Sequence, residues 1–194
     1  MAILTFVMFT VWALVRSFMN RPPGDYETEV CDIRLKDQLY DKAIQAANTA
    51  LEKTPDHRGA IMCKALVFIS QKMYLEANEE LNYLINFLEK NFKDDDPTGI
   101  GTLAAAYANR GIIKDRQENY EGALEDYIKA IKIDEEAVGG PGFGTVILNY
   151  KFKSSSVKER AIYIYEQLQL PEDERVLKIK ELDEGQVMHK PGKL

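Results

Sequence analysis

The sequence predicts an all-α protein built from stacked pairs of antiparallel helices. Four short segments of the chain align on small residues at Ala43, Ala77, Ala123 and Ala161. The first two are 34 residues apart, which is the length of a helix–turn–helix repeat. The composition, 45% hydrophobic and 29% charged, is typical of a globular chain and excludes wholesale disorder. One helix pair cannot bury its apolar face alone, so at least three pairs must stack.

Each element has a local signature. The alanines allow two helices to approach closely, where a larger side chain would separate them. Tyr40, Tyr74 and Tyr120 stand three residues before their alanines, near the start of the second helix of each pair. The third segment also carries an aromatic residue, a small residue and a second apolar face at helical spacing: Tyr107, Gly111, Tyr127 and Ala130, with Asp134 at its end.

These residues resemble the tetratricopeptide repeat (TPR) family. The resemblance covers about residues 24–175 and implies a right-handed α-α solenoid of about four helix pairs. The repeats would span about 24–57, 58–91, 104–137 and 142–175, within a solenoid of residues 25–175. The chain departs from the family pattern at Arg110, where Leu is usual, at Lys114, where Tyr is usual, and at Glu135, where the closing Pro is usual.

The later spacings, 46 and 38 residues, predict two insertions. The first lies near Asn91–Thr102, where Pro97 is expected to stop a helix. Its consecutive aspartates lack the alternating ligands of a calcium loop, so a solvated loop is predicted. The second is glycine-rich, and residues 145–153 after it alternate as a strand would. We expect a helix there, because a lone strand has no ladder partner in such a fold.

Both ends of the chain differ from the repeats. Residues 172–185 are predicted to form a capping helix, since Pro171 opens the segment, acidic residues follow and Gly185 closes it. Residues 186–194 are predicted to be a loose tail. Ala2–Val15 is an uncharged apolar run, followed by Arg16 and a linker over residues 20–24.

The apolar run predicts an N-terminal hydrophobic helix over residues 1–19. This helix is predicted to anchor the protein in a membrane through residues 2–19. That length is at the lower limit for a membrane span. Arg16 and Arg21 follow the run, so the positive-inside rule places the repeats on the cytoplasmic side of a single-pass protein. A signal peptide and a docked helix are the alternatives, although the run has neither a basic start nor a small-residue cleavage site.

The composition and motifs argue against several classes of function. Lys and Arg number 25 against 31 Asp and Glu, a net charge of −6, so we expect no nucleic-acid partner. The glycine-rich run 139–144 lacks the Lys-Ser/Thr of a phosphate-binding loop. With two His and two Cys, no catalytic, cofactor-binding or metal-binding residues are expected, and the protein is predicted not to be an enzyme. Cys31 and Cys63 are interpreted as buried thiols, because a disulfide would need close Cα atoms and an oxidising compartment.

The resemblance implies that the first helix of each pair lines a concave groove. Such a groove would suit an amphipathic helix or an extended apolar peptide, with Asn109 fixing the register of the peptide through backbone hydrogen bonds. The same side chains could instead fill the structure, packing against other helices or the protein's own termini. The predicted lining is Met62, Cys63, Leu66, Ile69, Ala105, Ala108, Asn109, Ile112, Arg116, Val146, Ile147 and Tyr150.

One TPR activity grips the carboxylates of chaperone C-termini with Lys, Asn and Arg at set positions. Those positions hold other residues here, so no chaperone carboxylate clamp is expected: Thr28, Asp32, Cys63, Ala105 and Asn109. The function predicted is that of a membrane-tethered adaptor or scaffold that binds a protein partner and assembles a membrane-associated complex. The alternatives are an exported soluble binding protein whose first segment is cleaved, and an enzyme or regulatory subunit with a hidden site.

Overall fold

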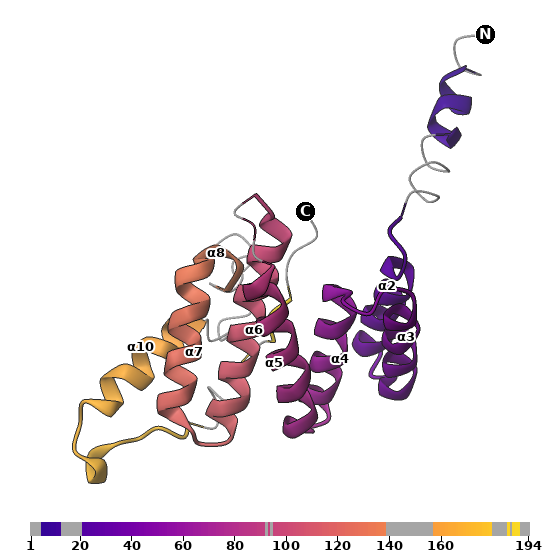
Figure 1. The fold of residues 1–194 in the computed structure, drawn as a ribbon. Helices are drawn as coiled ribbons and strands as arrows, with labels where there is room; N and C mark the ends of the chain where they lie inside the picture. Colours follow the sequence, from indigo (N-terminus) through magenta and orange to yellow (C-terminus); the bar gives the residue numbers. More distant parts are fainter. Residues whose placement is uncertain are drawn as a thin grey trace. The chain divides into compact units, whose positions relative to one another are not determined.

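The computed structural model describes residues 5–12, 21–91, 93, 95–138, 157–179, 186 and 188–190. All regular secondary structure within these ranges is helical, which confirms the predicted all-α class (Figure 1). The chain divides into two compact units, Met1–Cys63 and Lys64–Leu194. The segment 145–153, for which helix and strand both had support, lies outside the described residues.

The first unit is built on one helix pair. Helix α2 (Asp25–Lys36) packs against α3 (Tyr40–Lys53), and α4 (Arg58–Ser70) begins at the end of this unit. Ala43, Ala47 and Ala50 on α3 are completely buried, as the close approach of two helices requires. Gly24 precedes α2 with a φ of 95°, a conformation that glycine adopts without a side-chain clash.

A histidine joins the two ends of this unit. His57 Nε2 lies 2.8 Å from Asp25 Oδ1 at the start of α2. Its Nδ1 lies 3.4 Å from the Thr28 hydroxyl and accepts a hydrogen bond from the Ala60 amide at 3.3 Å. Because one nitrogen faces a carboxylate and the other accepts from a backbone amide at the start of α4, the ring is held as a structural link between α2 and α4.

A disulfide also connects α2 to α4. Cys31 and Cys63 are bonded, their Cα atoms are 6.4 Å apart, and both residues are fully buried. The interpretation of these residues as free thiols is therefore wrong, although both are buried as predicted. The Cα distance lies within the range that disulfides span without backbone movement.

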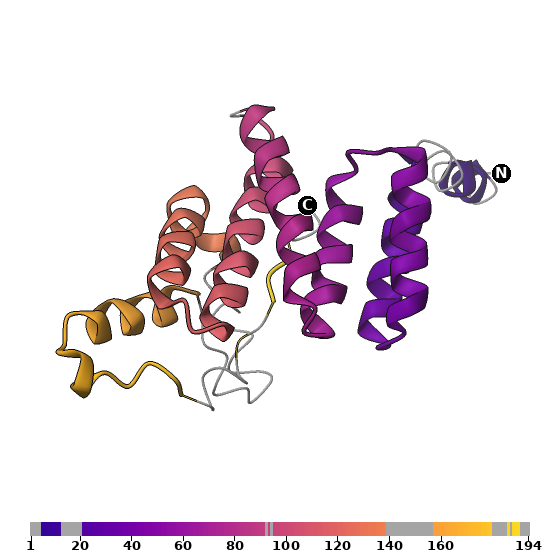
Figure 2. The same ribbon diagram turned by 60° about the horizontal axis from the view of Figure 1, so that its bottom comes forward.

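The second unit continues the pattern of helix pairs. Its helices are α5 (Tyr74–Lys90), α6 (Pro97–Arg116), α7 (Tyr120–Ile133), the short α8 (Glu135–Val138) and α10 (Val157–Leu168). Helix α6 packs against α5 and α7, and α10 packs against α7 (Figures 1 and 2). Ala77, Ala123 and Ala161 are buried, and α5 and α7 begin at the predicted tyrosines.

The turns within the helix pairs repeat as well. Gln38, Lys72 and Glu118 each occupy the left-handed region, with φ of 60°, 61° and 62°, two residues before the second helix of their pair. Non-glycine residues adopt this conformation infrequently. Its recurrence two residues before α3, α5 and α7 shows that these three turns share one backbone conformation.

Pro97 begins a helix rather than ending one, which corrects the predicted loop over Asn91–Thr102. It occupies the first turn of α6, where a missing backbone N–H costs nothing. Asp96 caps the helix, since its Oδ1 accepts from the Gly99 amide at 2.8 Å. Of the consecutive aspartates, this one has a structural role at a helix start, and α6 runs for 20 residues.

Gly111 lies where α6 meets the ring of Tyr127. A Cβ atom at position 111 would come within 2.6 Å of Tyr127 Cδ1 and Cε1 and 3.3 Å of the Ala123 carbonyl oxygen. Tyr127 is completely buried, so its ring has no space to move. The predicted small position on the first helix of the third pair is thus explained by a direct contact.

Gly111→Ala should lower the free energy of unfolding by about 1–2 kcal/mol, because overpacking outweighs the better helix propensity of alanine. Chemical denaturation with a two-state fit measures the change. In a Tyr127→Ala background the same substitution should cost much less, since the ring atoms that obstruct it are gone and only the approach of 3.3 Å to the Ala123 carbonyl oxygen remains. An equal loss in both backgrounds would contradict the steric explanation.

The predicted capping helix over 172–185 differs from the structure in its described part. Only Glu172–Glu174 is helical, as one 3₁₀ turn, and Arg175–Ile179 has no helical structure. Side chains of α10 hold this backbone instead: Gln167 Oε1 accepts from the Val176 amide at 2.7 Å, and the Tyr163 hydroxyl donates to the Val176 carbonyl at 2.6 Å. These tertiary hydrogen bonds use the groups that a helix would have paired.

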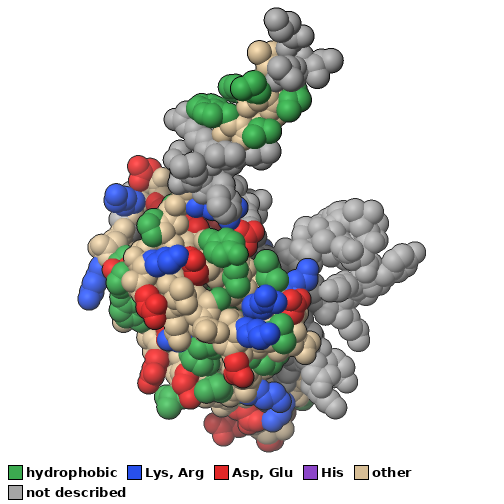
Figure 3. Space-filling view, turned by 90° about the vertical axis from the view of Figure 1, so that its right-hand side faces the viewer, with side chains coloured by type: hydrophobic (Ala, Val, Ile, Leu, Met, Phe, Trp, Pro, Cys, Tyr) green, Lys and Arg blue, Asp and Glu red, His purple; other side chains and the backbone are tan. Residues whose placement is uncertain are grey.

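The N-terminal segment is described only for residues 5–12, which form a helix. Phe6, Met8, Phe9 and Trp12 are exposed on it, and Figure 3 shows hydrophobic side chains on the visible face of this helix. Among the residues that the structure describes, no helix combines the length and the apolar character that crossing a membrane demands. The structure therefore gives no support to the predicted anchor, most of which lies outside the described ranges.

Candidate functional site

Nine of the twelve predicted groove residues lie on α4 and α6, and eight of these nine are buried. Met62 and Cys63 belong to the first unit, where Cys63 is used by the disulfide. Arg116, at the end of α6, is partly exposed. Val146, Ile147 and Tyr150 lie outside the described residues. The remaining predicted residues are buried in the second unit: Leu66, Ile69, Ala105, Ala108, Asn109 and Ile112.

Asn109 binds the backbone of the protein's own C-terminal segment. Its Nδ2 donates to the His189 carbonyl at 2.6 Å, and its Oδ1 accepts from the His189 amide at 2.8 Å. The side-chain amide thus pairs with both polar groups of one residue, as a neighbouring strand would. Figures 1 and 2 show the C-terminal segment beside α6. The predicted loose tail is therefore wrong for residues 186 and 188–190.

Further residues of the segment touch neighbouring helices. Met188 Sδ lies 3.9 Å from the Ser70 hydroxyl at the end of α4. The Gln186 amide donates to Asp115 Oδ2 at 2.8 Å and to the Tyr127 hydroxyl at 3.0 Å. We call residues 186 and 188–190 the docked segment.

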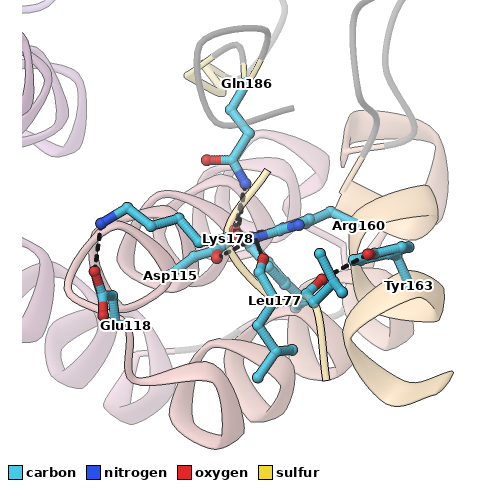
Figure 4. A network of polar contacts seen from close by, with 9 residues as sticks. Asp115, Glu118, Arg160, Tyr163, Leu177, Lys178 and Gln186 are labelled. Carbon is cyan, nitrogen blue, oxygen red and sulfur yellow. Dashed lines mark hydrogen bonds and ion pairs between the residues drawn. The ribbon is translucent and has the colours of Figure 1, made fainter. Parts of the chain in front are cut away.

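Asp115 is the centre of a buried polar network on α6, α7 and α10 (Figure 4). Arg160 binds it through two hydrogen bonds, Nε to Oδ2 at 2.8 Å and Nη2 to Oδ1 at 2.7 Å. Both side chains are only 1% exposed. The Tyr127 hydroxyl donates to Asp115 Oδ2 at 3.2 Å. Burial, and next the nearby Asp115 carboxylate, raise the pKa of Tyr127 well above its usual value, so the hydroxyl stays a donor.

The network extends to the segment after the 3₁₀ turn. Arg160 Nη2 also donates to the Leu177 carbonyl at 3.0 Å, and Lys178 pairs with Glu118 at the surface (Figure 4). Arg175 donates to the Leu170 carbonyl at 2.9 Å. Helix α10 is the last α-helix among the described residues. The chain that packs against it after the 3₁₀ turn is extended and not helical.

His189 is held in its neutral form while it is docked. Burial lowers the pKa of its imidazole to about 4, because a protonated ring would lose its hydration there. A free histidine has a pKa near 6.5. The docked segment thus presents no charge from this ring next to Asn109 at neutral pH.

Docking should weaken on acidification. Protonation favours the undocked state, whose histidine pKa is higher, so docking is strongest above pH 6.5 and weakens as the pH falls towards 4. We expect a loss of roughly twentyfold in the docking equilibrium between pH 7 and pH 5. Amide hydrogen exchange at His189, measured at both values after correction for intrinsic rates, tests this. His189→Ala should show no such dependence, and an unchanged equilibrium in the parent would contradict the prediction.

Two of the three departures from the family pattern, Arg110 and Lys114, have a common explanation on another side of α6. Arg110 binds Asp126 of α7 through two hydrogen bonds, both of 2.7 Å, and Lys114 lies 2.8 Å from Asp126 Oδ2. Asp126 is buried, so the two cations replace apolar residues in order to neutralise it. Tyr107 donates to Glu89 on α5, and burial together with Glu89 raises its pKa to about 12.

Sequence reasoning singled out Asn109 for backbone hydrogen bonds, which the structure shows within the chain itself, and it missed Asp115, Arg160 and the docked segment. Asp115 and Arg160 are 45 residues apart, and nothing local distinguishes them from solvated charges. A signal was present at Asp115, which follows Ile112 at helical spacing on the buried face of α6. Within the described residues, no group of three or more His, Cys, Asp or Glu side chains is placed to hold a metal ion.

Comparison with known protein families identifies the helix pair formed by α6 and α7. The family model of the tetratricopeptide repeat matches residues 104–136, which include most of α6 and all of α7. The chain contains a tetratricopeptide repeat. The resemblance drawn from Tyr107, Gly111, Tyr120 and Ala123 is thereby confirmed, and the docked segment lies against the first helix of this repeat.

The curated relatives share part of the chain. "DnaJ homolog subfamily C member 7" of Mus musculus is 33% identical over 106 residues, and its Homo sapiens counterpart is 32% identical. The match covers 51% of this chain and 21% of each relative. Among solved structures, "Arabidopsis OM64 TPR domain" is 15% identical, with a TM-score of 0.48, and the match covers 59% of this chain and 84% of that one.

Proposed function

We propose that this protein is a non-enzymatic adaptor that binds an extended segment of a partner protein along α6. The two hydrogen bonds between Asn109 and the backbone of His189 carry the proposal. A side-chain amide that pairs with a peptide N–H and C=O orients an extended chain whatever its side chains are. The tetratricopeptide repeat at residues 104–136 supports a role in protein–protein interaction.

A selection of random ten-residue peptides on the full-length protein tests this function. Bound peptides should lose about tenfold or more in affinity for Asn109→Leu, because both backbone hydrogen bonds disappear. Asn82→Leu is the matched control, since Asn82 is exposed on α5 and accepts from Arg110 instead. The selection should also use His189→Pro as bait. This variant lacks the N–H that donates to Asn109 Oδ1, so its own C-terminal segment is bound less firmly at Asn109. Peptides that bind Asn109→Leu as well as the parent would refute the proposed site.

Membrane attachment through residues 2–19, with the repeats on the cytoplasmic side, stays part of the proposal. It is supported by the uncharged run Ala2–Val15 and the following Arg16 alone. Carbonate extraction of membranes from cells that express the full chain tests it. The protein should remain in the membrane pellet, and a variant lacking residues 1–23 should not. Equal retention of both would refute an anchor in this segment.

One observation favours the alternative of an exported binding protein. The Cys31–Cys63 disulfide is of a kind that persists in oxidising compartments and is rare in the cytosol. An exported protein would lose its first segment on cleavage. Intact-mass measurement of the native protein discriminates between the two: a mass that lacks about 20 residues supports export, and the full mass supports the anchored form.

A further inference from the structure

We propose that the docked segment and a partner's peptide compete for the same site, so that the protein carries its own competitor. This inference rests on the proposed function. The structure pairs the backbone of His189 with Asn109, the residue that we expect to orient a partner's peptide. One side-chain amide cannot pair with two backbones in this way, so binding of the two segments is mutually exclusive.

The contacts of the segment define the chemistry of the partner. The neutral side-chain amide of Gln186 donates to both Asp115 and the Tyr127 hydroxyl. Two residues later, the thioether of Met188 lies against Ser70. The next residue is bound through its backbone and carries an uncharged ring. The partner we infer is an extended peptide with Asn or Gln at one position, an apolar residue two positions later and an uncharged residue after that.

The polar network explains why the amide is preferred at its position. Arg160 already neutralises Asp115, whose Oδ2 accepts from Arg160, Tyr127 and Gln186. A carboxylate in place of the amide could not donate and would add a negative charge beside Asp115. A lysine would add an uncompensated positive charge next to Arg160. The geometry therefore selects a neutral donor.

The segment also has the advantage of being attached to the same chain. Tethering makes its docking intramolecular, with an effective concentration in the millimolar range for a flexible connection. A free partner peptide must overcome this competition, and its apparent affinity falls by the fraction of molecules in which the site is open. A substitution that weakens docking should therefore strengthen partner binding.

The test uses a fluorescent peptide of residues 184–194 and three forms of the full-length protein. His189→Pro removes the N–H that Asn109 accepts, whereas His189→Ala keeps it and removes only the ring. We expect the peptide to bind His189→Pro at least about tenfold more tightly than the parent. His189→Ala should resemble the parent at neutral pH more than His189→Pro does. Changing Gln186 to Glu in the peptide should abolish the gain.

Hydrogen exchange at the His189 amide of the parent provides an independent readout. A protected His189 amide, together with tighter peptide binding to His189→Pro than to the parent, supports competition. Exchange at the rate of a free peptide would overturn docking, although the proposed function would stand if selected peptides still required Asn109. A protected amide without peptide binding to His189→Pro would overturn competition and make the segment a permanent part of the fold. Sedimentation should give a monomer, and a dimer that dissociates on His189→Pro would overturn docking within one chain, because the segment would then dock on a second copy.

Discussion

Arg160→Met is expected to lower the free energy of unfolding by about 3–5 kcal/mol. The substitution leaves the buried carboxylate of Asp115 without its cation, and the Leu177 carbonyl loses a donor. The cost comes from the uncompensated charge more than from the lost attraction. Urea or guanidinium denaturation, analysed with a common slope, measures the effect.

Two further variants test the cause of that loss. Lys158→Met, on the same helix, removes an ion pair with Glu135 whose side chains are both more than half exposed, and it should cost at most about 1 kcal/mol. Asp115→Leu together with Arg160→Met should recover part of the stability, since no isolated charge remains. A double variant that is less stable than Arg160→Met alone would show that the charge is not the main source of the loss.

Loss of the Cys31–Cys63 bond should destabilise the first unit by about 3–4 kcal/mol. The bond closes a loop with a sequence separation of 32 residues, and the estimate is the entropy that such a loop restores to the unfolded chain. The measurement compares chemical denaturation of the first unit in two preparations. One keeps the disulfide, and the other has been reduced while the chain was unfolded.

The disulfide prediction has a direct control, because the chain contains only two cysteines. Cys31→Ala/Cys63→Ala should be as unstable as the reduced parent, and reductant should not change it further. The unfolded, non-reduced parent should contain no free thiol. Two titratable thiols in that preparation would contradict the bond, and with it the argument for export.

Local regularities explain how much of the fold could be predicted. Ala43, Ala77 and Ala123 and the tyrosines before them recur because each helix pair meets the same packing requirement. Pro97 was misassigned for a physical reason: proline is compatible with the first turn of a helix as well as with a stop, and only the cap at Asp96 decides between them.

The candidate site could be predicted only where one helix carries the signal. Asn109 was predicted because the repeat resemblance places it on the first helix of a pair, and it is a polar residue among the buried alanines of α6. The occupant could not be predicted, because His189 follows 80 residues later and its contact uses backbone atoms that every residue possesses. Arg175–Ile179 shows the same limit, since side chains of α10 override a helical pattern there.

The buried polar network cannot form until the last of its residues has been synthesised, which affects the newly made chain. Asp115 leaves the ribosome 45 residues before Arg160 and 71 before Gln186. At roughly 5–20 residues per second, its carboxylate waits about 2–9 seconds for its cation and longer for the amide. During that interval the third helix pair cannot bury Asp115 without cost. A transcript with a premature stop before Arg160 would therefore yield a product that cellular quality control treats as unfinished, although most of the repeats have been made.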